Sequence, residues 1–310
     1  MTLLLGVDNG GTRVKLLLAR EVGGRLEHVR TDDAPTPRGP AAMDELAALT
    51  RAFLADDRAD AFGITVAGIL DEASGVVATS ANMRWLEGLA PARELADRLD
   101  LPGEAVQDGV ATAIAEAVLG AGRGADDVFV LALGTGIAGA HVVDGAVRKG
   151  AHGGAGEIGH LATGRGERCT CGQSGCLESV LGGTRLGARW DRARGVGAAS
   201  TALDVVLAAE RGDGTARAIL DEATTALANG LLSVMAMIDP GVIVIGGGLS
   251  NSPTWIIDPA VDKAHRQATF HSVPPIVRAQ LGSWAGAWGA AVTAGHRTSG
   301  ERRLERTEMV

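Results

Sequence analysis

One plan occurs twice along this 310-residue chain: an apolar run, a turn rich in glycine, and a second apolar run. The four apolar runs are Thr2–Val7, Arg13–Ala19, Val128–Leu133 and Ile137–Val143. Short apolar runs joined by glycine-containing turns are typical of β-hairpins. Because roughly 100 to 200 residues form one domain, a chain of this length has room for two. The repeated hairpin therefore predicts two α/β domains built on a duplicated architecture.

Helix and strand patterns alternate along the rest of the chain. Helical spacing of apolar residues is found at Met43–Leu54, Val110–Leu119, Ala216–Ile238 and Gly286–Ala294. Further strands are expected at Leu26–Arg30, Phe62–Val66, Glu104–Gln107 and Val242–Ile245. The glycines of Gly120–Gly124 mark a boundary. We therefore expect an N-terminal α/β lobe over residues 1–120, completed by a helix near 290–310, and a C-terminal α/β lobe over residues 121–289.

Charge and hydropathy exclude several classes of protein. With 37 acidic and 29 basic residues the formal net charge is -8, which offers no basic surface to nucleic acid or to an anionic membrane. The apolar N-terminal stretch is interrupted by Asp8, Arg13 and Lys15, so it predicts neither a signal peptide nor a membrane span. We expect a cytoplasmic protein without nucleic-acid or membrane partners.

Three glycine turns follow strands and offer backbone N–H groups to an anion. They are Asp8-Asn9-Gly10-Gly11-Thr12, Gly134-Thr135-Gly136 and Gly246-Gly247-Gly248. Without a Cβ, glycine lets a phosphate approach the backbone, and Thr12 adds a hydroxyl donor. A single turn of this kind is more often only a tight turn. Their order in the chain resembles the two phosphate segments and the adenosine segment of the actin, Hsp70 and hexokinase superfamily.

That resemblance implies ATP as a phosphoryl donor, with Mg²⁺ bridging its phosphates and Asp8 as the carboxylate that holds the ion. The alternative for Asp8 is an Asx-turn residue that fixes the hairpin, and the two roles can coexist. Polyphosphate is the alternative donor.

The cysteines form one cluster. Cys169, Cys171 and Cys176 lie within eight positions, Gly172 and Gly175 allow the chain to curl back, and His160 lies nine residues upstream. Three cysteines and one histidine are the ligands of a closed tetrahedral Zn²⁺ site, which would be structural because no position is left for water. The alternatives are one disulfide with a spare thiol, or three inert buried cysteines. An odd number of clustered cysteines in a cytoplasmic protein favours zinc.

The segment that contains these ligands resembles a family signature. Gly150-Ala151-His152-Gly153-Gly154-Ala155-Gly156-Glu157-Ile158-Gly159-His160 is followed by Cys169-Thr170-Cys171-Gly172-Gln173-Ser174-Gly175-Cys176-Leu177-Glu178, and together they resemble the ROK family of sugar kinases. The resemblance extends from Gly6 through all three glycine turns. It implies a two-lobed, ribonuclease-H-like α/β fold of the actin and hexokinase type, with the active site in the interdomain cleft.

The resemblance also implies roles for individual residues. The catalytic base of the family is the Asp of an Asn-Asp pair, with a Glu eight residues later, and Asp108 and Glu116 match that spacing. Gln107 stands where the family has Asn. The residues implied to contact the sugar are Gly68, Asn82, Gln107, Asp108, Glu157, His160 and Glu178. Considered alone, Asp108 is more simply a helix N-cap, because an Ala-rich helix follows it.

These features together predict an ATP-dependent kinase that phosphorylates a hexose, at O6 by resemblance to hexose 6-kinases. The run Gln107-Asp108-Gly109-Val110 and Pro253 after the Gly248 turn resemble the allose kinases of the family, so D-allose is the expected substrate. Glucose and N-acetylated hexosamines are the alternatives. A carboxylate such as Asp108 can accept the proton of the attacking hydroxyl. Alternatives of another class are a sugar-sensing ROK regulator and a non-catalytic sugar-binding protein. Because the first hairpin begins at Thr2, we expect no DNA-binding domain of the kind that such a regulator carries ahead of it. We also expect a homodimer.

A final expectation concerns the cysteine loop. We expect that loss of the metal weakens sugar binding more than nucleotide binding, because the loop carries Glu178 while the glycine turns lie elsewhere.

Overall fold

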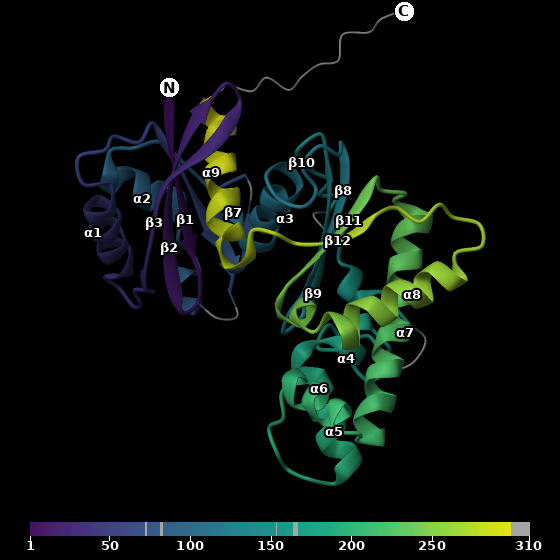
Figure 1. Cartoon of the computed structure of the whole chain (residues 1–310). Coiled ribbons are helices and arrows are strands. Elements are labelled where there is room, and N and C mark those ends of the chain that lie inside the picture. The colour runs from purple at the N-terminus through teal and green to yellow at the C-terminus, as the bar shows by residue number, and fades with distance from the viewer. Residues whose placement is uncertain (72, 81–82, 153, 164–166, 299–310) are drawn as a thin grey trace, which may run out of the picture. The chain divides into compact units, whose positions relative to one another are not determined.

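The computed structural model describes residues 1–71, 73–80, 83–152, 154–163 and 167–298, and it divides the chain into two compact units (Figure 1). Unit 1 is Met1–Ala115 with Ser283–Val310, and unit 2 is Glu116–Gly282. Both boundaries fall a few residues before the expected positions 120 and 289. The carboxylate of Glu116 accepts hydrogen bonds from the N–H groups of Ala121, Gln280 and Leu281, which ties this residue to unit 2.

Unit 1 contains a five-stranded sheet, a small hairpin and the helices around them. The sheet strands are β1 (Thr2–Asn9), β2 (Arg13–Val22), β3 (Arg25–Pro35), β4 (Ala61–Val66) and β7 (Gly103–Gln107), and the hairpin is β5 (Ile69–Asp71) and β6 (Val76–Thr79). The helices are α1 (Ala42–Leu54), α2 (Pro91–Leu99), the start of α3 (Asp108–Val118), α9 (Ala285–Thr298) and the short η1 (Arg84–Leu86). The chain passes into unit 2 within α3, and returns within the short helix η5 (Gly282–Trp284).

Unit 2 contains a second five-stranded sheet and most of the helices. Its strands are β8 (Asp127–Leu133), β9 (Ile137–Val143), β10 (Ala146–Val147), β11 (Val242–Gly246) and β12 (Ile276–Arg278). Its helices are α4 (Leu177–Leu181), α5 (Gly183–Arg194), α6 (Ala202–Glu210), α7 (Gly214–Met237), α8 (Asp258–Gln267), and the short η2 (Ile158–His160), η3 (Gly248–Asn251) and η4 (Pro253–Ile257). No helix among the described residues is both long and apolar enough to span a bilayer.

The two sheets have the same topology. The first has the order β3-β2-β1-β4-β7 and the second has the order β10-β9-β8-β11-β12. In each, the hairpin and its extra strand pair antiparallel, and two later strands add in parallel on the other side. Parallel pairing needs a crossover connection, which explains why helices separate the parallel strands in the sequence. The repeated hairpin seen in the sequence is thus the antiparallel half of each sheet.

Helices cover both faces of the sheet of unit 1. On one face, α1 and α2 pack through residues such as Leu46 and Leu95 against Leu5, Val7 and Ile64 of the strands. On the other face, α9 contributes Ala287, Ala291 and Ala294 to small apolar clusters. Figure 1 shows α9 in yellow beside the purple strands, with α1 and α2 on their other side. A strand buried on both faces is mostly apolar, as β4 is apart from Thr65.

Helix α9 approaches this sheet so closely that backbone touches backbone. A Cβ on Gly6 of β1 would lie 2.0 Å from the carbonyl oxygen of Ala287, and one on Gly63 of β4 would lie 2.0 Å from that of Ala290. A Cβ on Gly289 would lie 1.9 Å from the carbonyl oxygen of Ala111 in α3. Such distances are impossible for real side chains, so glycine is required at all three positions.

Several strand boundaries differ from the sequence-based expectation. Asp8 and Asn9 belong to β1 rather than to the turn, because both pair with β2, opposite Lys15 and Val14. Strand β3 continues to Pro35, beyond the expected end at Arg30, because its pairing with β2 resumes after a β-bulge near Leu18. The short strands β5, β6, β10 and β12 were not expected, since runs of two to four residues carry little periodicity.

The glycine contacts of α9 give a test of the fold. We expect Gly63→Ala to lower the free energy of unfolding by about 3 kcal/mol or more, because the added methyl must push α9 off the sheet. Denaturant unfolding of the variant and of the wild type measures the change. The control is Gly214→Ala at the first residue of α7, where a Cβ meets nothing within 4 Å and stability should stay the same or rise slightly. Equal stability of Gly63→Ala and the wild type would contradict the close contact.

Candidate active site and metal centre

In unit 1, the predicted site residues gather where parallel strands end. Asp8 is near the end of β1, Gly68 follows β4, and Gln107 ends β7 and is followed by Asp108. The registers place Val7 beside Ile64 and Val66 beside Gln107. All these residues therefore lie at the carboxyl edge of the three parallel strands, where α/β proteins commonly bind ligands.

The Asp8 carboxylate is held in place by two neighbours. Its Oδ1 accepts a hydrogen bond of 2.8 Å from the hydroxyl of Thr65, whose oxygen in turn accepts one from the Asn9 N–H. A Cβ on Gly286 would lie 2.7 Å from the carboxyl carbon, so the first turn of α9 packs directly on the carboxylate. A helix N-terminus favours a negative charge. Oδ2 accepts no hydrogen bond within the described residues and lies 3.6 Å from Nζ of Lys15, so its lone pairs remain open to a metal ion.

The second carboxylate, Asp108, is the first residue of α3. Its Oδ1 accepts a hydrogen bond of 2.8 Å from the N–H of Gly109. Although the residue is in contact with solvent, the protein around it desolvates the carboxylate, and this raises the pKa of Asp108. The hydrogen bond from Gly109 opposes this rise, and the charge of Asp8 adds to it. A carboxylate with a raised pKa is better suited to accept a proton than an ordinary one.

Two residues that follow β3, Thr36 and Arg38, hold the turn between β1 and β2 by hydrogen bonds. Thr36 donates to the carbonyl of Gly10 and, through its N–H, to that of Thr12, while Arg38 donates to the carbonyl of Gly11. These bonds use carbonyl groups and leave the N–H groups of Gly11 and Thr12 without a partner within the described residues. A rigid turn with open N–H groups is suited to an anion.

In unit 2, the other two glycine turns lie against each other. Gly134-Thr135-Gly136 connects β8 to β9, and Gly247 follows β11, the parallel neighbour of β8. A Cβ on Gly247 would lie 2.3 Å from the carbonyl oxygen of Leu133, and the φ angle of Gly247 is 86°. Only glycine combines this left-handed backbone with so close a contact.

Glu178 lies against the first of these turns. Its Oε2 accepts a hydrogen bond of 2.9 Å from the N–H of Ile137, and a Cβ on Gly136 would lie 2.5 Å from that same oxygen. Gly183, just after α4, donates to the carbonyl of Gly134 at 2.9 Å. The expectation that the glycine turns lie away from the cysteine loop is therefore wrong for Gly134–Gly136.

Ile137 also brings in the segment of Glu157 and His160. Gly159 of η2 packs on it so closely that a Cβ would lie 2.1 Å from the Ile137 carbonyl oxygen. Glu157, which is exposed, directly precedes η2, and His160 is its last residue. Unit 2 thus brings together Glu157, His160, Glu178 and the Gly134 turn around one backbone position.

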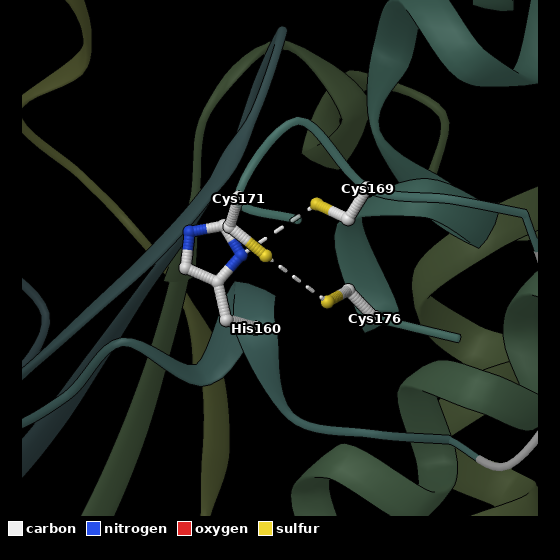
Figure 2. A group of neighbouring side chains, drawn as sticks. All are labelled: His160, Cys169, Cys171 and Cys176. Carbon is white, nitrogen blue, oxygen red and sulfur yellow. Dashed lines mark hydrogen bonds between the residues drawn. The ribbon is translucent and has the colours of Figure 1, made fainter. Parts of the chain in front are cut away.

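The cysteine loop forms a compact four-residue cluster. His160, Cys169, Cys171 and Cys176 each offer a ligand atom within 4.8 Å of the others, and their side chains point toward one another (Figure 2). Nδ1 of His160 lies 3.8 Å from Sγ of Cys169, and Sγ of Cys171 lies 3.6 Å from Sγ of Cys176. All three cysteines are free thiols, so no disulfide is formed.

These distances fit a tetrahedral metal ion. With Zn–S bonds of about 2.3 Å, two sulfurs of a tetrahedron lie about 3.8 Å apart. The shape of the loop depends on the N–H of Cys169, which donates to the carbonyl of Gln173, and on Gly172 and Gly175, with φ angles of 95° and 76°. Burial raises the pKa of the Cys176 thiol to about 12, whereas the backbone N–H of Cys171 lowers the pKa of Cys169 to about 7. A bound cation would favour the thiolate form of both.

Asn82, one of the residues implied to contact the sugar, falls outside the described residues. Gln107 is exposed at the end of β7, in unit 1. Glu116 is buried, and its carboxylate accepts hydrogen bonds from backbone N–H groups of unit 2. Sequence reasoning missed Thr65, which orients Asp8, because a single threonine in a buried strand carries no signal of its own.

The sequence profile of the ROK family matches residues 4–297. The chain belongs to the ROK family. Glucokinase from Streptomyces coelicolor is 30% identical over 317 residues, which cover 94% of this chain and 97% of that protein. N-acetylmannosamine kinase from Escherichia coli O157:H7 is 30% identical over 292 residues, which cover 94% and 97% of the two chains.

Solved structures of ROK proteins share the fold. The ROK hexokinase from Thermus thermophilus is 30% identical, with a TM-score of 0.88 over 97% of this chain and 100% of that one. A ROK family glucokinase from Streptomyces griseus, in complex with glucose and AMPPNP, is 29% identical, with a TM-score of 0.74 over 95% and 99%. The expected α/β fold of the actin and hexokinase type is confirmed.

The electrostatics of Asp108 predict the stability of a variant of this ROK protein. A folded-state pKa above the unfolded value means that ionised Asp108 costs stability at pH 7, and that the cost disappears below the unfolded pKa of about 3.9. We expect Asp108→Asn to melt at the same temperature as the wild type or higher at pH 7, with a smaller difference at pH 4. Thermal melting at both pH values checks this. A clearly lower melting temperature at pH 7 would mean that the carboxylate stabilises the fold, as a helix cap would.

Proposed function

We propose that this ROK protein is an ATP-dependent kinase that phosphorylates a hexose, with O6 as the acceptor oxygen. The observation that carries the proposal is the pair Asp8 and Asp108 at the carboxyl edge of one parallel sheet, where Asp108 has a raised pKa. The ROK relatives named glucokinase, hexokinase and N-acetylmannosamine kinase support a sugar acceptor. The AMPPNP bound to the Streptomyces griseus glucokinase supports ATP as the donor.

In the proposed reaction the sugar hydroxyl attacks the γ-phosphorus of ATP. The bond from that phosphorus to the β–γ bridging oxygen breaks, ADP leaves, and the proton of the hydroxyl passes to Asp108. Gly68 and Gln107 at the same sheet edge, together with Glu157, His160 and Glu178 of unit 2, are proposed to bind the sugar hydroxyls. Carboxylates suit this role because charged acceptors form the stronger hydrogen bonds.

The glycine turns are proposed to bind the donor. The phosphates of ATP would accept hydrogen bonds from the N–H groups of Gly11 and Thr12 and from the Gly134–Gly136 turn. The nucleoside would contact Gly246–Gly248. Mg²⁺ fits Asp8, whose Oδ2 accepts no hydrogen bond from the described part of the chain, because Mg²⁺ is usually held by one or two carboxylates plus substrate phosphates. Its charge would neutralise the phosphates during transfer.

Zinc is proposed to fill the cluster of His160, Cys169, Cys171 and Cys176. With four protein ligands it would be structural. Nδ1 of His160 is directed at Cys169, so we propose that Nε2–H donates to a sugar hydroxyl. Cys176 directly precedes α4, which carries Glu178, so the ion would also fix the carboxylate that contacts the Gly134 turn.

A coupled phosphotransfer screen tests the proposal. ATP and polyphosphate serve as donors, and the acceptors are D-allose, favoured by the sequence, with glucose and N-acetylmannosamine, favoured by the relatives. We expect ATP-dependent turnover of at least one of them, with the product phosphorylated at O6. Sugar binding without any phosphotransfer would contradict the kinase and favour a sugar-binding protein. The homodimer and the cytoplasmic location remain predictions.

Asp108→Asn tests the catalytic base. We expect kcat to fall by roughly 10²-fold or more while the hexose still binds, since Asn keeps the shape of Asp but cannot accept the proton. The control is Asp97→Asn, an equivalent change at an exposed position of α2, which should leave kcat unchanged. In the wild type, kcat/KM should fall as the pH drops through the raised pKa of Asp108. Wild-type turnover in Asp108→Asn would remove this residue from the mechanism.

Cys171→Ser tests the metal centre. We expect the wild type to contain about one zinc per chain by elemental analysis and the variant to lose most of it. Because Glu178 and Gly183 both contact the Gly134 turn, sugar and AMPPNP should both bind more weakly, which replaces the expectation of a selective sugar defect. Ser174→Ala, an exposed change in the same loop, is the control. Wild-type calorimetric affinities for both ligands in a zinc-free variant would refute the coupling.

A further inference from the structure

Three hydrogen bonds meet at Ser80, a buried serine that directly follows β6. Its hydroxyl donates to the carbonyl of Ala67 at 2.6 Å and accepts from the N–H of Met83 at 3.1 Å. Its own N–H donates to Oε1 of Glu87 at 3.0 Å. All three distances are those of ordinary hydrogen bonds. Because Ala67 follows β4 while Met83 and Glu87 lie at the two ends of η1, this serine joins the end of β4 to η1.

Ser80 also lies against the turn of Gly68, which is proposed above to bind the hexose. A Cβ on Gly68 would lie 2.4 Å from the carbonyl oxygen of Thr79 and 3.1 Å from Cβ of Ser80. The N–H of Gly68 donates to the carbonyl of Val66, so the chain turns sharply here. The register of β5 and β6 shifts at Ile69, and such irregularities are common next to active sites. The shape of the Gly68 turn therefore depends on the position of Thr79 and Ser80.

The hydrogen bonds of the Ser80 hydroxyl are shielded from solvent. Ser80 is 2% exposed, and Met83 belongs to a small apolar cluster with Val66, Val77 and Leu86. A hydrogen bond in such surroundings is stronger than one in water, and a buried donor or acceptor that loses its partner is costly. The hydroxyl of Ser80 thus holds the backbone on both sides of it in one arrangement.

The groups proposed to bind ATP are held by other residues. Thr65 orients Asp8, and Thr36 and Arg38 hold the turn between β1 and β2. These hydrogen bonds do not involve Ser80 or its partners. A change at Ser80 should therefore affect the binding of the hexose and leave the binding of the nucleotide as it is.

We propose that Ser80 is a positioning residue for the hexose, whose hydroxyl fixes the turn of Ala67 and Gly68 in the conformation that binds the sugar. This inference rests on the proposed function. Groups that contact a substrate keep their geometry when a second set of hydrogen bonds holds them, and a small displacement of such a group is costly. No motif marks Ser80 in the sequence, because a serine after a strand is more often only a turn residue.

The test compares Ser80→Ala with Ser74→Ala, a matched change in the turn of the same hairpin, where the exposed Ser74 donates to Asp71. Calorimetry measures the affinities for glucose, N-acetylmannosamine, D-allose and Mg²⁺-AMPPNP, and kinetics measure kcat and KM for the hexose. For Ser80→Ala we expect hexose affinity to fall and KM to rise by about 10-fold, with kcat and AMPPNP affinity within about twofold of the wild type. A misplaced turn weakens hexose binding equally in the ground state and the transition state. Ser74→Ala should match the wild type.

Glu87→Ala decides the question if Ser80→Ala does not fold. Glu87 is exposed, so its loss should leave the fold intact while the N–H of Ser80 loses its acceptor. We expect KM for the hexose to rise by about threefold at unchanged kcat. Wild-type hexose affinity and KM in the folded Ser80→Ala, or in Glu87→Ala where Ser80→Ala does not fold, overturn the proposal. An equal loss of hexose and AMPPNP affinity overturns it too, because a general distortion of the protein would have that effect.

The calorimetric measurements separate this inference from the proposed function. A wild type that binds a hexose but transfers no phosphate to it would refute the kinase, and the hexose affinities of the variants would still decide the role of Ser80. A wild type that binds none of the three sugars would overturn both.

Discussion

Direct backbone contact between α9 and the sheet of unit 1 positions the acidic residues of this ROK protein. Gly6 and Gly63 let the helix lie on β1 and β4 without intervening side chains, and Gly289 brings it against the start of α3. The same helix places Gly286 on the Asp8 carboxylate, while α3 begins with Asp108. One helix therefore packs against the Asp8 carboxylate and against the helix that begins with Asp108.

Much of the fold could be predicted from the sequence because its signals are local. Alternating or continuous apolar runs mark β1, β4, β8 and β11, and the helical repeat marks α1 and α7 to within two residues at each end. The cluster of His160 and the three cysteines could be predicted as well, because the ligand number and the glycines limit what such a loop can do. Asn9 could not: its buried side-chain amide has no hydrogen-bond partner within the described residues, an arrangement that no pattern indicates.

Contacts between residues far apart in the sequence account for what could not be predicted. Glu178 was expected to face a sugar, yet its carboxylate also supports the Gly134 turn through the N–H of Ile137, 41 residues away in the chain. Glu116 matched a family position by spacing, but its bonds to Gln280 and Leu281 span more than 160 residues. Spacing identifies residue types that belong to a site, whereas the partner of each carboxylate depends on how strands and loops meet in three dimensions.

The place of α9 after unit 2 in the sequence affects the order of assembly on the ribosome. Unit 2 is one continuous segment, Glu116–Gly282, while unit 1 needs Ser283 onward to cover the α9 face of its sheet. Until that helix leaves the ribosome, Leu4, Leu17 and Ala61 have no helix to cover them and stay in contact with water. The N-terminal half is thus synthesised first but completes its core last, and the newly made strands are most exposed to aggregation during this interval.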